Sequence, residues 1–196
     1  MAEVLLFHHV MGLTNGVQSF AQALRDGGHT VHVPDLFDGR RPGSIDEGMQ
    51  LVREVGDEPL QAAAEHAALG LPPELVYAGF SFGAGLAQTL AQTRTGTRGA
   101  LLFESCLPVT GEWAIGPWPE GVAVQIHGMD NDPYFALGGD LDAARELVTL
   151  VGPALAELFV YPGDRHLFAD SSLPSFDAES AALLTQHALE FLDRLG

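Results

Sequence analysis

Lysine is absent from the sequence, and only nine arginines stand against 26 aspartates and glutamates, so the formal net charge is -17. A chain this acidic repels the phosphate backbone of nucleic acids, which proteins bind through basic stripes or patches. The nearest approach to such a patch is the pair Arg40 and Arg41, in a segment that contains glycine and proline. We therefore expect no nucleic-acid partner.

Cysteine and long apolar runs are scarce as well. The single cysteine, Cys106, cannot form an internal disulfide, so cysteine usage does not point to an oxidising compartment. The apolar run near the N-terminus is too short for a signal peptide, and no run reaches the length of a transmembrane helix. We expect a cytoplasmic protein without attachment to a membrane.

The composition favours one globular domain. Of the 196 residues, 46% are hydrophobic and 18% are charged, and the sequence contains neither repeats nor a linker. A chain of this length can bury about 70% of the surface that it exposes when unfolded. We therefore expect residues 1–196 to form one domain with a substantial core.

Short apolar runs alternate with amphipathic helical patterns along the whole chain. The runs that predict strands are 4–7, 30–33, 75–78, 100–103, 122–126 and 155–160. The patterns that predict helices cover about 17–24, 44–52, 60–68, 82–93, 140–151 and 177–195. This alternation is typical of an α/β protein with a parallel sheet of at least six strands, right-handed crossovers and helices on both faces. Ligands of such sheets bind at the carboxyl ends of the strands, so the residues that follow each strand are the candidates for chemistry.

Local signals indicate how some helices begin. Ser44 starts a capping-box pattern, after which Met49 and Val52 are expected to face inward. Pro59 is expected to open the next helix, and Asp140 to cap the helix that follows the fifth strand.

Residues 79–83, Gly-Phe-Ser-Phe-Gly, match the pattern G-x-S-x-G. In this pattern a serine occupies a strained turn between a strand and a helix, which raises its hydroxyl above the edge of the sheet. The pattern alone is weak, because about 0.1 matches are expected by chance in a chain with this much glycine. Here a predicted strand precedes it and a predicted helix follows it, as the turn requires. Ser81 is therefore the candidate nucleophile and the N–H of Phe82 a candidate oxyanion donor, with an ordinary glycine-rich turn as the alternative.

A serine hydroxyl reacts at neutral pH only when a histidine takes its proton and an acid orients that histidine. In sheets of this type the order along the chain is serine, acid, histidine. Only His166 and His187 follow both the serine and the candidate acids, and His187 falls within the last helical pattern. We therefore predict His166 as the base.

The acid and the second oxyanion donor are expected just after other strands. Asp132 and Asp130 follow the fifth predicted strand, and Glu104, which follows the fourth, is a third candidate for the acid. The backbone N–H of Val10, in the loop after the first strand, is the natural second donor to an oxyanion.

The doublet His8-His9 together with Asp35 could instead suggest a metal site. Adjacent residues of an extended chain point to opposite faces, so the doublet is a poor pair of ligands. We expect neither a metal ion nor an organic cofactor.

These residues resemble the dienelactone hydrolase family, the small branch of the α/β-hydrolase fold without a large lid. The similarity runs nearly end to end and includes the loop 9–12, the Pro-Asp-Leu turn at 34–36, the elbow 79–83 and the Tyr-Pro-Gly-x-x-His-x-Phe stretch at 161–168. Residues 132–135, Asp-Pro-Tyr-Phe, resemble the acid loop of the family, which favours Asp132 over Asp130. The resemblance implies an α/β-hydrolase fold with a triad of Ser81, Asp132 and His166.

Two departures from the family pattern bear on the chemistry. Named members of the family use a cysteine nucleophile within G-x-C-x-G, whereas position 81 is serine and Cys106 lies outside the elbow. Those members bind the carboxylate of dienelactone with arginines, one of them from the region before the elbow, where residues 60–77 of this sequence contain none. We therefore predict a serine nucleophile and do not expect activity on dienelactone itself. The acidity of the chain, with its net charge of -17, favours neutral esters or lactones over anionic ones.

The predicted function is hydrolysis of a small ester or lactone through an acyl-enzyme. Four aromatic residues on predicted loops are expected to line the substrate pocket: Trp113, Tyr134, Phe135 and Phe168. Two other hypotheses remain, namely a binding or regulatory protein on the same scaffold, and an acyltransferase whose acceptor is not water.

Overall fold

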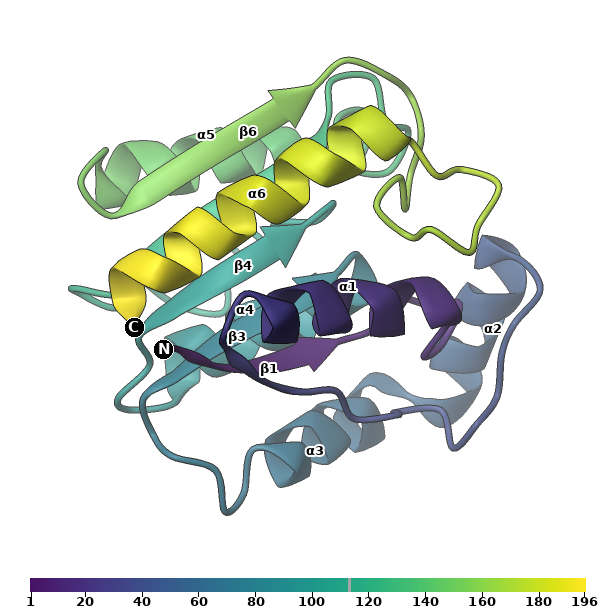
Figure 1. Ribbon diagram of the computed structural model, residues 1–196, viewed down its shortest axis with the longest axis horizontal. Helices are drawn as coiled ribbons and strands as arrows, with labels where there is room; N and C mark the ends of the chain where they lie inside the picture. The colour runs from purple at the N-terminus through teal and green to yellow at the C-terminus, as the bar shows by residue number, and fades with distance from the viewer. Residues whose placement is uncertain (113) are drawn as a thin grey trace.

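One sheet of six parallel strands lies at the centre of the molecule (Figure 1). The computed structural model describes residues 1–112 and 114–196. The strands are β1 (Glu3–Phe7), β2 (Thr30–His32), β3 (Leu75–Phe80), β4 (Gly99–Phe103), β5 (Ala123–Met129) and β6 (Ala156–Tyr161). Their order across the sheet is β2-β1-β3-β4-β5-β6, so the chain changes direction across the sheet between β1 and β3. The carboxyl ends of strands at such a switch point are the usual place for a ligand.

Helices cover both faces of the sheet. They are α1 (Asn15–Asp26), α2 (Ile45–Val55), α3 (Asp57–Ala67), α4 (Phe82–Thr93), α5 (Asp140–Val151) and α6 (Ala178–Leu195). Helices α1 and α6 pack on one face, in front in Figure 1, and α3, α4 and α5 pack on the other. Helix α2 lies beyond the carboxyl end of β1, and no large lid covers that edge in the described part of the chain. None of the helices in the described ranges combines the length and the hydropathy needed to span a bilayer.

The strands bury alternate side chains on the two faces. In β3, Val76, Ala78 and Phe80 join the core under α1 and α6, whereas Leu75 and Tyr77 join the core under α3, α4 and α5. A strand that is buried on both faces reads as a continuous apolar run, as the sequence does here.

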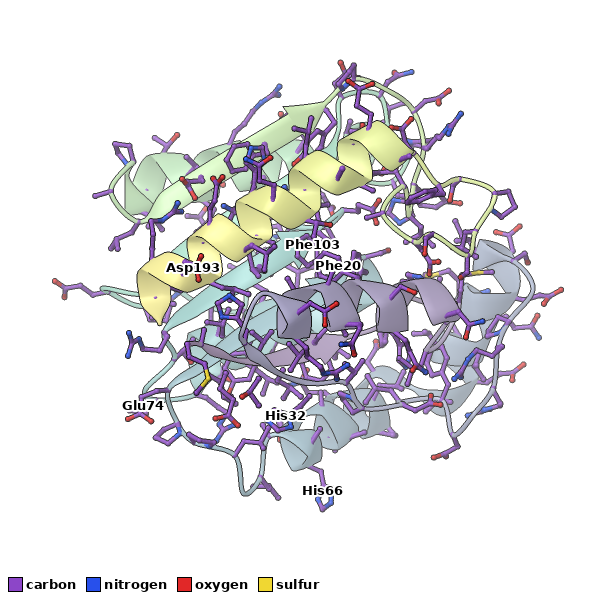
Figure 2. The ribbon with its side chains drawn as sticks, viewed as in Figure 1. Phe20, His32, His66, Glu74, Phe103 and Asp193 are labelled. Atoms are coloured by element: carbon purple, nitrogen blue, oxygen red, sulfur yellow. The ribbon has the colours of Figure 1, made fainter. Side chains whose placement is uncertain are left out.

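Aromatic side chains fill the space between α1 and the sheet. Phe20 of α1 meets Phe103 of β4 edge-on, with ring centroids 5.2 Å apart (Figure 2). Phe80, at the end of β3, lies 5.1 Å from Phe20 and 4.7 Å from Phe103, again between ring centroids. This cluster supports the backbone immediately before residue 81.

The predicted strands and helices and their alternation are confirmed, with ends that differ by at most three residues. Helix α3 begins at Asp57, two residues before the predicted start at Pro59. Pro59 therefore lies in the first turn of the helix, where proline is tolerated. Ser44 caps α2 as predicted, because its side chain accepts a hydrogen bond from the N–H of Glu47.

Helix α2 buries only part of the face that was predicted, since Val52 is buried as expected and Met49 is not. Its buried residues include Gly48 and Val52, whereas Met49 is 40% exposed, so the inward orientation of Met49 was wrong. At Gly48 the helix approaches the loop after β1 so closely that a Cβ would lie 2.3 Å from the carbonyl oxygen of Val10. Position 48 therefore faces inward, and position 49, about 100° further around the helix, turns to solvent.

The start of α5 also differs from the prediction. Its N-cap is Gly139, which makes no side-chain cap, and Asp140 is the first helical residue. The carboxylate of Asp140 accepts hydrogen bonds from the hydroxyl of Ser105 at 2.7 Å and from the N–H of Cys106 at 3.1 Å. Asp140 therefore ties the loop after β4 to α5 instead of capping its own helix.

Candidate active site

Ser81 occupies the turn between β3 and α4, with backbone angles of φ 49° and ψ -113°. A positive φ is strained for a residue with a side chain. The N–H of Ser81 donates to the carbonyl of Phe103 at 2.7 Å, which ties the turn to β4. At Gly83 the helix lies so close to the end of β1 that a Cβ would be 2.6 Å from the carbonyl oxygens of Phe7 and His8. The turn thus holds the serine hydroxyl above the edge of the sheet.

A chain of hydrogen bonds joins Ser81, His166 and Asp132. The Ser81 hydroxyl lies 2.8 Å from Nε2 of His166, and Nδ1 of the same ring lies 2.7 Å from Oδ2 of Asp132. A carboxylate oxygen accepts, so Nδ1 holds the ring proton and donates it, and Nε2 is free to accept from the serine. These side chains follow β3, β6 and β5, whose carboxyl ends lie together in the sheet.

The two aspartates after β5 make different contacts. Asp132 is fully buried, and its second oxygen accepts the N–H groups of Tyr134 at 2.8 Å and Phe135 at 3.2 Å. Asp130 is exposed, and its carboxylate accepts the N–H of Gly163 at 3.0 Å. Asp132 is therefore the aspartate in contact with the imidazole, and Asp130 closes a turn.

Several carboxyl groups act on the ring of His166. Burial disfavours the charged imidazole, but the hydrogen bond to Asp132 and the charges of Glu104, Asp132 and Asp140 outweigh burial and raise the pKa of His166. A higher pKa makes the ring a stronger base toward a serine proton. The half-exposed ring of Tyr134 packs against the imidazole, with centroids 4.6 Å apart.

Val10 and Phe82, the predicted oxyanion donors, lie at the same corner of the sheet. Phe82 is the first residue of α4, so its N–H has no partner within the helix. Val10 is buried in the loop after β1. The close approach at Gly83 sets the start of α4 against the residues that precede Val10.

The histidine doublet after β1 points in two directions. His8 donates from Nδ1 to the carbonyl of His9 at 2.8 Å and accepts the N–H of Leu36 at Nε2, at 3.0 Å. Burial lowers the pKa of His8 to about 4. Among the residues that the structure describes, no three His, Cys, Asp or Glu side chains gather in a way that could hold a metal ion.

His9 forms a buried pair with Asp170, at 2.8 Å between Nε2 and Oδ2. Its Nδ1 accepts the N–H of Met11 at 3.2 Å, which shapes the loop that contains Val10. Burial raises the pKa of Asp170, but hydrogen bonds from His9, Ser172 and Thr14 outweigh it and lower the pKa to about 2. This network joins the loop after β1 to the segment that follows residue 166.

A cavity of about 690 Å³ opens beside the serine, between α3 and α4. Its lining residues are Asp57, Glu58, Gln61, Ala62, Glu65, Ser81, Phe82, Gly85, Leu86, Thr89, Ser105 and Leu107. Helix α4 and the loop after β4 supply apolar surface, and α3 supplies three carboxylates. No basic side chain lines this cavity in the described part of the chain. Its volume lies within the range of small-molecule binding sites.

The four aromatic residues predicted for the pocket are placed differently. Phe135 and Phe168 are fully buried in the two core clusters and do not line the cavity, because each packs inward, three residues after Asp132 and two residues after His166. Tyr134 is half exposed beside the imidazole. Trp113 lies outside the described residues.

The cavity wall includes residues that the sequence did not indicate as functional. Glu58, Gln61 and Glu65 share one face of α3 at helical spacing, but no local signal tells which way that face points. Ser105 and Leu107 follow β4, and their position after a strand was a usable signal.

The fold resembles those of known hydrolases. Similar structures are the putative dienelactone hydrolase from Klebsiella pneumoniae subsp. pneumoniae (TM-score 0.76, 18% identity, covering 99% of this chain and 87% of that one) and a dienelactone hydrolase-like promiscuous phosphotriesterase from metagenomic libraries (0.78, 18%, 100% and 87%). A third is a thermophilic esterase from Thermogutta terrifontis with bound propionate (0.63, 15%, 100% and 84%). At these identities the structural likeness shows the fold alone. The comparison with curated proteins found no match to the sequence.

A sequence model of the Dienelactone hydrolase family matches residues 1–196. The match covers the strand-turn-helix around Ser81 and the loops that place His166 and Asp132 beside it. The chain therefore belongs to the dienelactone hydrolase family.

Proposed function

We propose that the protein hydrolyses small uncharged esters or lactones through an acyl-enzyme on Ser81. The Oγ of Ser81 attacks the carbonyl carbon, and its proton passes to Nε2 of His166. The carbonyl oxygen becomes an oxyanion that faces the N–H groups of Val10 and Phe82. Asp132 keeps the ring in the tautomer that accepts at Nε2 and stabilises the imidazolium.

The proton then completes a cycle. Nε2 of His166 gives it to the alcohol oxygen as the carbon–oxygen bond of the ester breaks, which leaves the acyl group on Ser81. A water molecule next donates a proton to the same nitrogen and adds to the acyl carbon. Ser81 leaves with that proton, and the carboxylic acid is released.

One observation supports this proposal above the others. The Ser81 hydroxyl, the imidazole of His166 and the carboxylate of Asp132 form a continuous series of 2.8 Å and 2.7 Å hydrogen bonds. A nucleophile that contacts a base, which in turn contacts an orienting acid, is the arrangement that activates serine in unrelated hydrolases. A binding protein on this scaffold would have no need of that alignment.

The preference for uncharged substrates is supported by the cavity. Asp57, Glu58 and Glu65 face it, and its described lining contains no arginine that could pair with a carboxylate. An anionic ester would therefore lose its hydration without gaining a counter-charge. Neutral acyl and alcohol groups fit the apolar surface of α4.

The test is labelling with a fluorophosphonate probe together with hydrolysis of 4-nitrophenyl esters. The wild type is expected to take one label, located at Ser81 by peptide mass spectrometry. Ser81→Ala and His166→Ala are expected to lose the label and about 10^4-fold or more of kcat/KM. Ser105→Ala, which removes the other serine of the same cavity, is expected to leave the label on residue 81.

The opposite results would refute the proposal. A label on Ser105, or ester hydrolysis that survives in Ser81→Ala, would mean that another group is the nucleophile. A wild type that neither reacts with the probe nor hydrolyses any ester would support a non-catalytic binding protein instead.

A further inference from the structure

Strained backbone is concentrated around the triad. Ser81, Glu104 and Leu167 have positive φ values of 49°, 62° and 61°, and among the other non-glycine residues of the described ranges Asp38 alone shares this feature. A residue with a side chain keeps such a conformation only where its surroundings enforce it. The strand-to-helix turn accounts for Ser81, but Glu104 and Leu167 require another reason.

The carboxyl group of Glu104 connects these two strained positions. Its Oε1 accepts the N–H of Phe168 at 2.7 Å, and this is the peptide that follows Leu167. The backbone N–H of Glu104 donates to the carbonyl of His127 at 2.7 Å, which fixes Glu104 to the sheet. The turn that begins at His166 is therefore clamped to the end of β4.

Glu104 is buried in a way that is unfavourable for a carboxyl group. It is 1% exposed, and its Oε2 has no hydrogen-bond partner among the described residues. Buried polar atoms in folded proteins are nearly always paired, so an unpaired carboxyl oxygen lowers stability. Such unfavourable burial is common where a group serves the chemistry of a site. Asp132 already occupies the position of the triad acid, so Glu104 needs a separate role.

We propose that Glu104 is a positioning residue for the hydrolytic site, which holds the turn that contains His166 and stabilises the protonated imidazole. The inference rests on the proposed function, in which His166 takes up and releases a proton in each half of the reaction. The carboxyl group acts through the peptide of Phe168 and through its charge. It does not contact the substrate.

The charges that act on Glu104 and His166 come from several segments. Asp132 after β5, Glu104 after β4 and Asp140 at the start of α5 act on His166, whereas His166, Asp132 and Asp170 act on Glu104. Burial raises the pKa of Glu104 to about 7, the imidazole opposes the rise, and the two aspartates add to it. The protonation of Glu104 is therefore coupled to that of His166, because each group's charge acts on the other.

The sign of the coupling follows from the charges. An ionised Glu104 favours the imidazolium, so removal of its charge lowers the pH at which His166 takes up a proton. Glu104→Gln removes the charge but keeps a carbonyl oxygen that can accept the N–H of Phe168. We expect the NMR titration midpoint of the His166 ring to fall by about 1 pH unit in this variant, a roughly tenfold change in its proton dissociation constant.

Asp130→Asn is the matched control. Like Glu104→Gln, it neutralises one carboxylate near a strand end, in this case after β5. Asp130, however, is exposed, and its carboxylate accepts the N–H of Gly163. The midpoint of His166 is expected to stay at its wild-type value. An equal fall in this control would show that any lost charge moves the midpoint, and would overturn the specific role of Glu104.

Comparison of Glu104→Ala with Glu104→Gln separates the clamp from the charge, because alanine removes both and glutamine removes only the charge. The kcat of Glu104→Ala for ester hydrolysis is expected to fall below that of Glu104→Gln while KM changes little, so that the glutamine restores part of the rate. Equal kcat values in Glu104→Ala, Glu104→Gln and the wild type would contradict the clamp.

A measurement on the wild type keeps the inference testable if these variants fail to fold. Carbon NMR of protein labelled at glutamate carboxyl carbons is expected to show Glu104 titrating near pH 7. A Glu104 signal that titrates near its ordinary value of about 4 would overturn the inference. These titrations need no substrate, so a wild type without esterase activity would refute the proposed function and leave this result unaffected.

Discussion

At the scale of single residues, the loop after β5 shows that the path of the backbone decides which carboxylate meets the histidine. Asp132 turns inward, with one oxygen on the ring of His166 and the other on two backbone N–H groups. Asp130, two positions earlier, turns outward and binds Gly163. The two side chains are chemically identical, so their roles differ only through their surroundings.

This difference can be measured with paired variants. Asp132→Asn is expected to lower kcat for ester hydrolysis by about 10^3- to 10^4-fold, because an amide that donates to Nδ1 stabilises the wrong tautomer of His166. Asp130→Asn is expected to keep a rate close to that of the wild type. Steady-state kinetics on one neutral ester compare the two. A larger loss in Asp130→Asn would assign the acid to position 130.

The candidate residues were predictable to different degrees. Ser81 and His166 could be predicted from local patterns, because a nucleophile turn and a strand end are each visible within a few residues. Asp132 was separated from Asp130 only by resemblance to a family, since nothing local distinguishes them. Their catalytic roles stay predictions, whereas the hydrogen bonds that join them are present in the structure.

At the scale of elements, the first turn of α4 combines a close contact with an open one. A Cβ on Gly83 would lie 2.6 Å from two carbonyl oxygens of the chain at the end of β1, which are backbone atoms with little freedom to move. A Cβ on Gly85 would meet only a side-chain carbon of Leu107, at 3.6 Å, an ordinary van der Waals distance. Substitution by alanine is therefore expected to change stability in opposite directions at these two positions of one helix.

Thermal and urea unfolding of the two alanine variants test this contrast. Gly83→Ala is expected to lower the free energy of unfolding by about 3 kcal/mol, because the helix must move away from β1. Gly85→Ala is expected to raise it by up to about 1 kcal/mol, since alanine favours the helical backbone. If both variants lost similar stability, the close packing at Gly83 would not be the cause.

Two predictions for elements failed, one about a helix face and one about a helix end, whereas the cap of α2 by Ser44 was confirmed. Met49 is exposed because α2 docks through Gly48, and Asp140 binds the loop after β4 rather than its own helix. Periodicity predicts that a helix has an apolar side. It does not say which neighbour that side will meet.

At the scale of the whole molecule, the parallel sheet brings the ends of β3, β5 and β6 to one edge, where Ser81, His166 and Asp132 meet beside a cavity with acidic side chains. The net charge of -17 and the three carboxylates on the cavity wall both disfavour the approach of an anion. We therefore expect a negatively charged substrate to be repelled both at a distance and within the cavity.

Two matched esters test this charge preference. The monoester 4-nitrophenyl hydrogen adipate has a free carboxylate. Methyl 4-nitrophenyl adipate has the same six-carbon acyl chain but is neutral. We expect kcat/KM for the anion to be about tenfold lower at low ionic strength, and the gap to narrow as salt screens the charges. An anion that reacts as fast as the neutral ester at every salt concentration would contradict an electrostatic preference.

Hydrophobic period, glycine placement and strand-helix alternation act over a few residues, so they predict the elements, their order and the turn that exposes Ser81. The folded arrangement was needed to show which aromatic rings are core, which face of α3 lines the cavity, that Asp132 contacts His166, and that Glu104 contacts the turn after His166. These outcomes depend on loops that are distant in the chain and meet after the sheet has formed. No local pattern records where they meet.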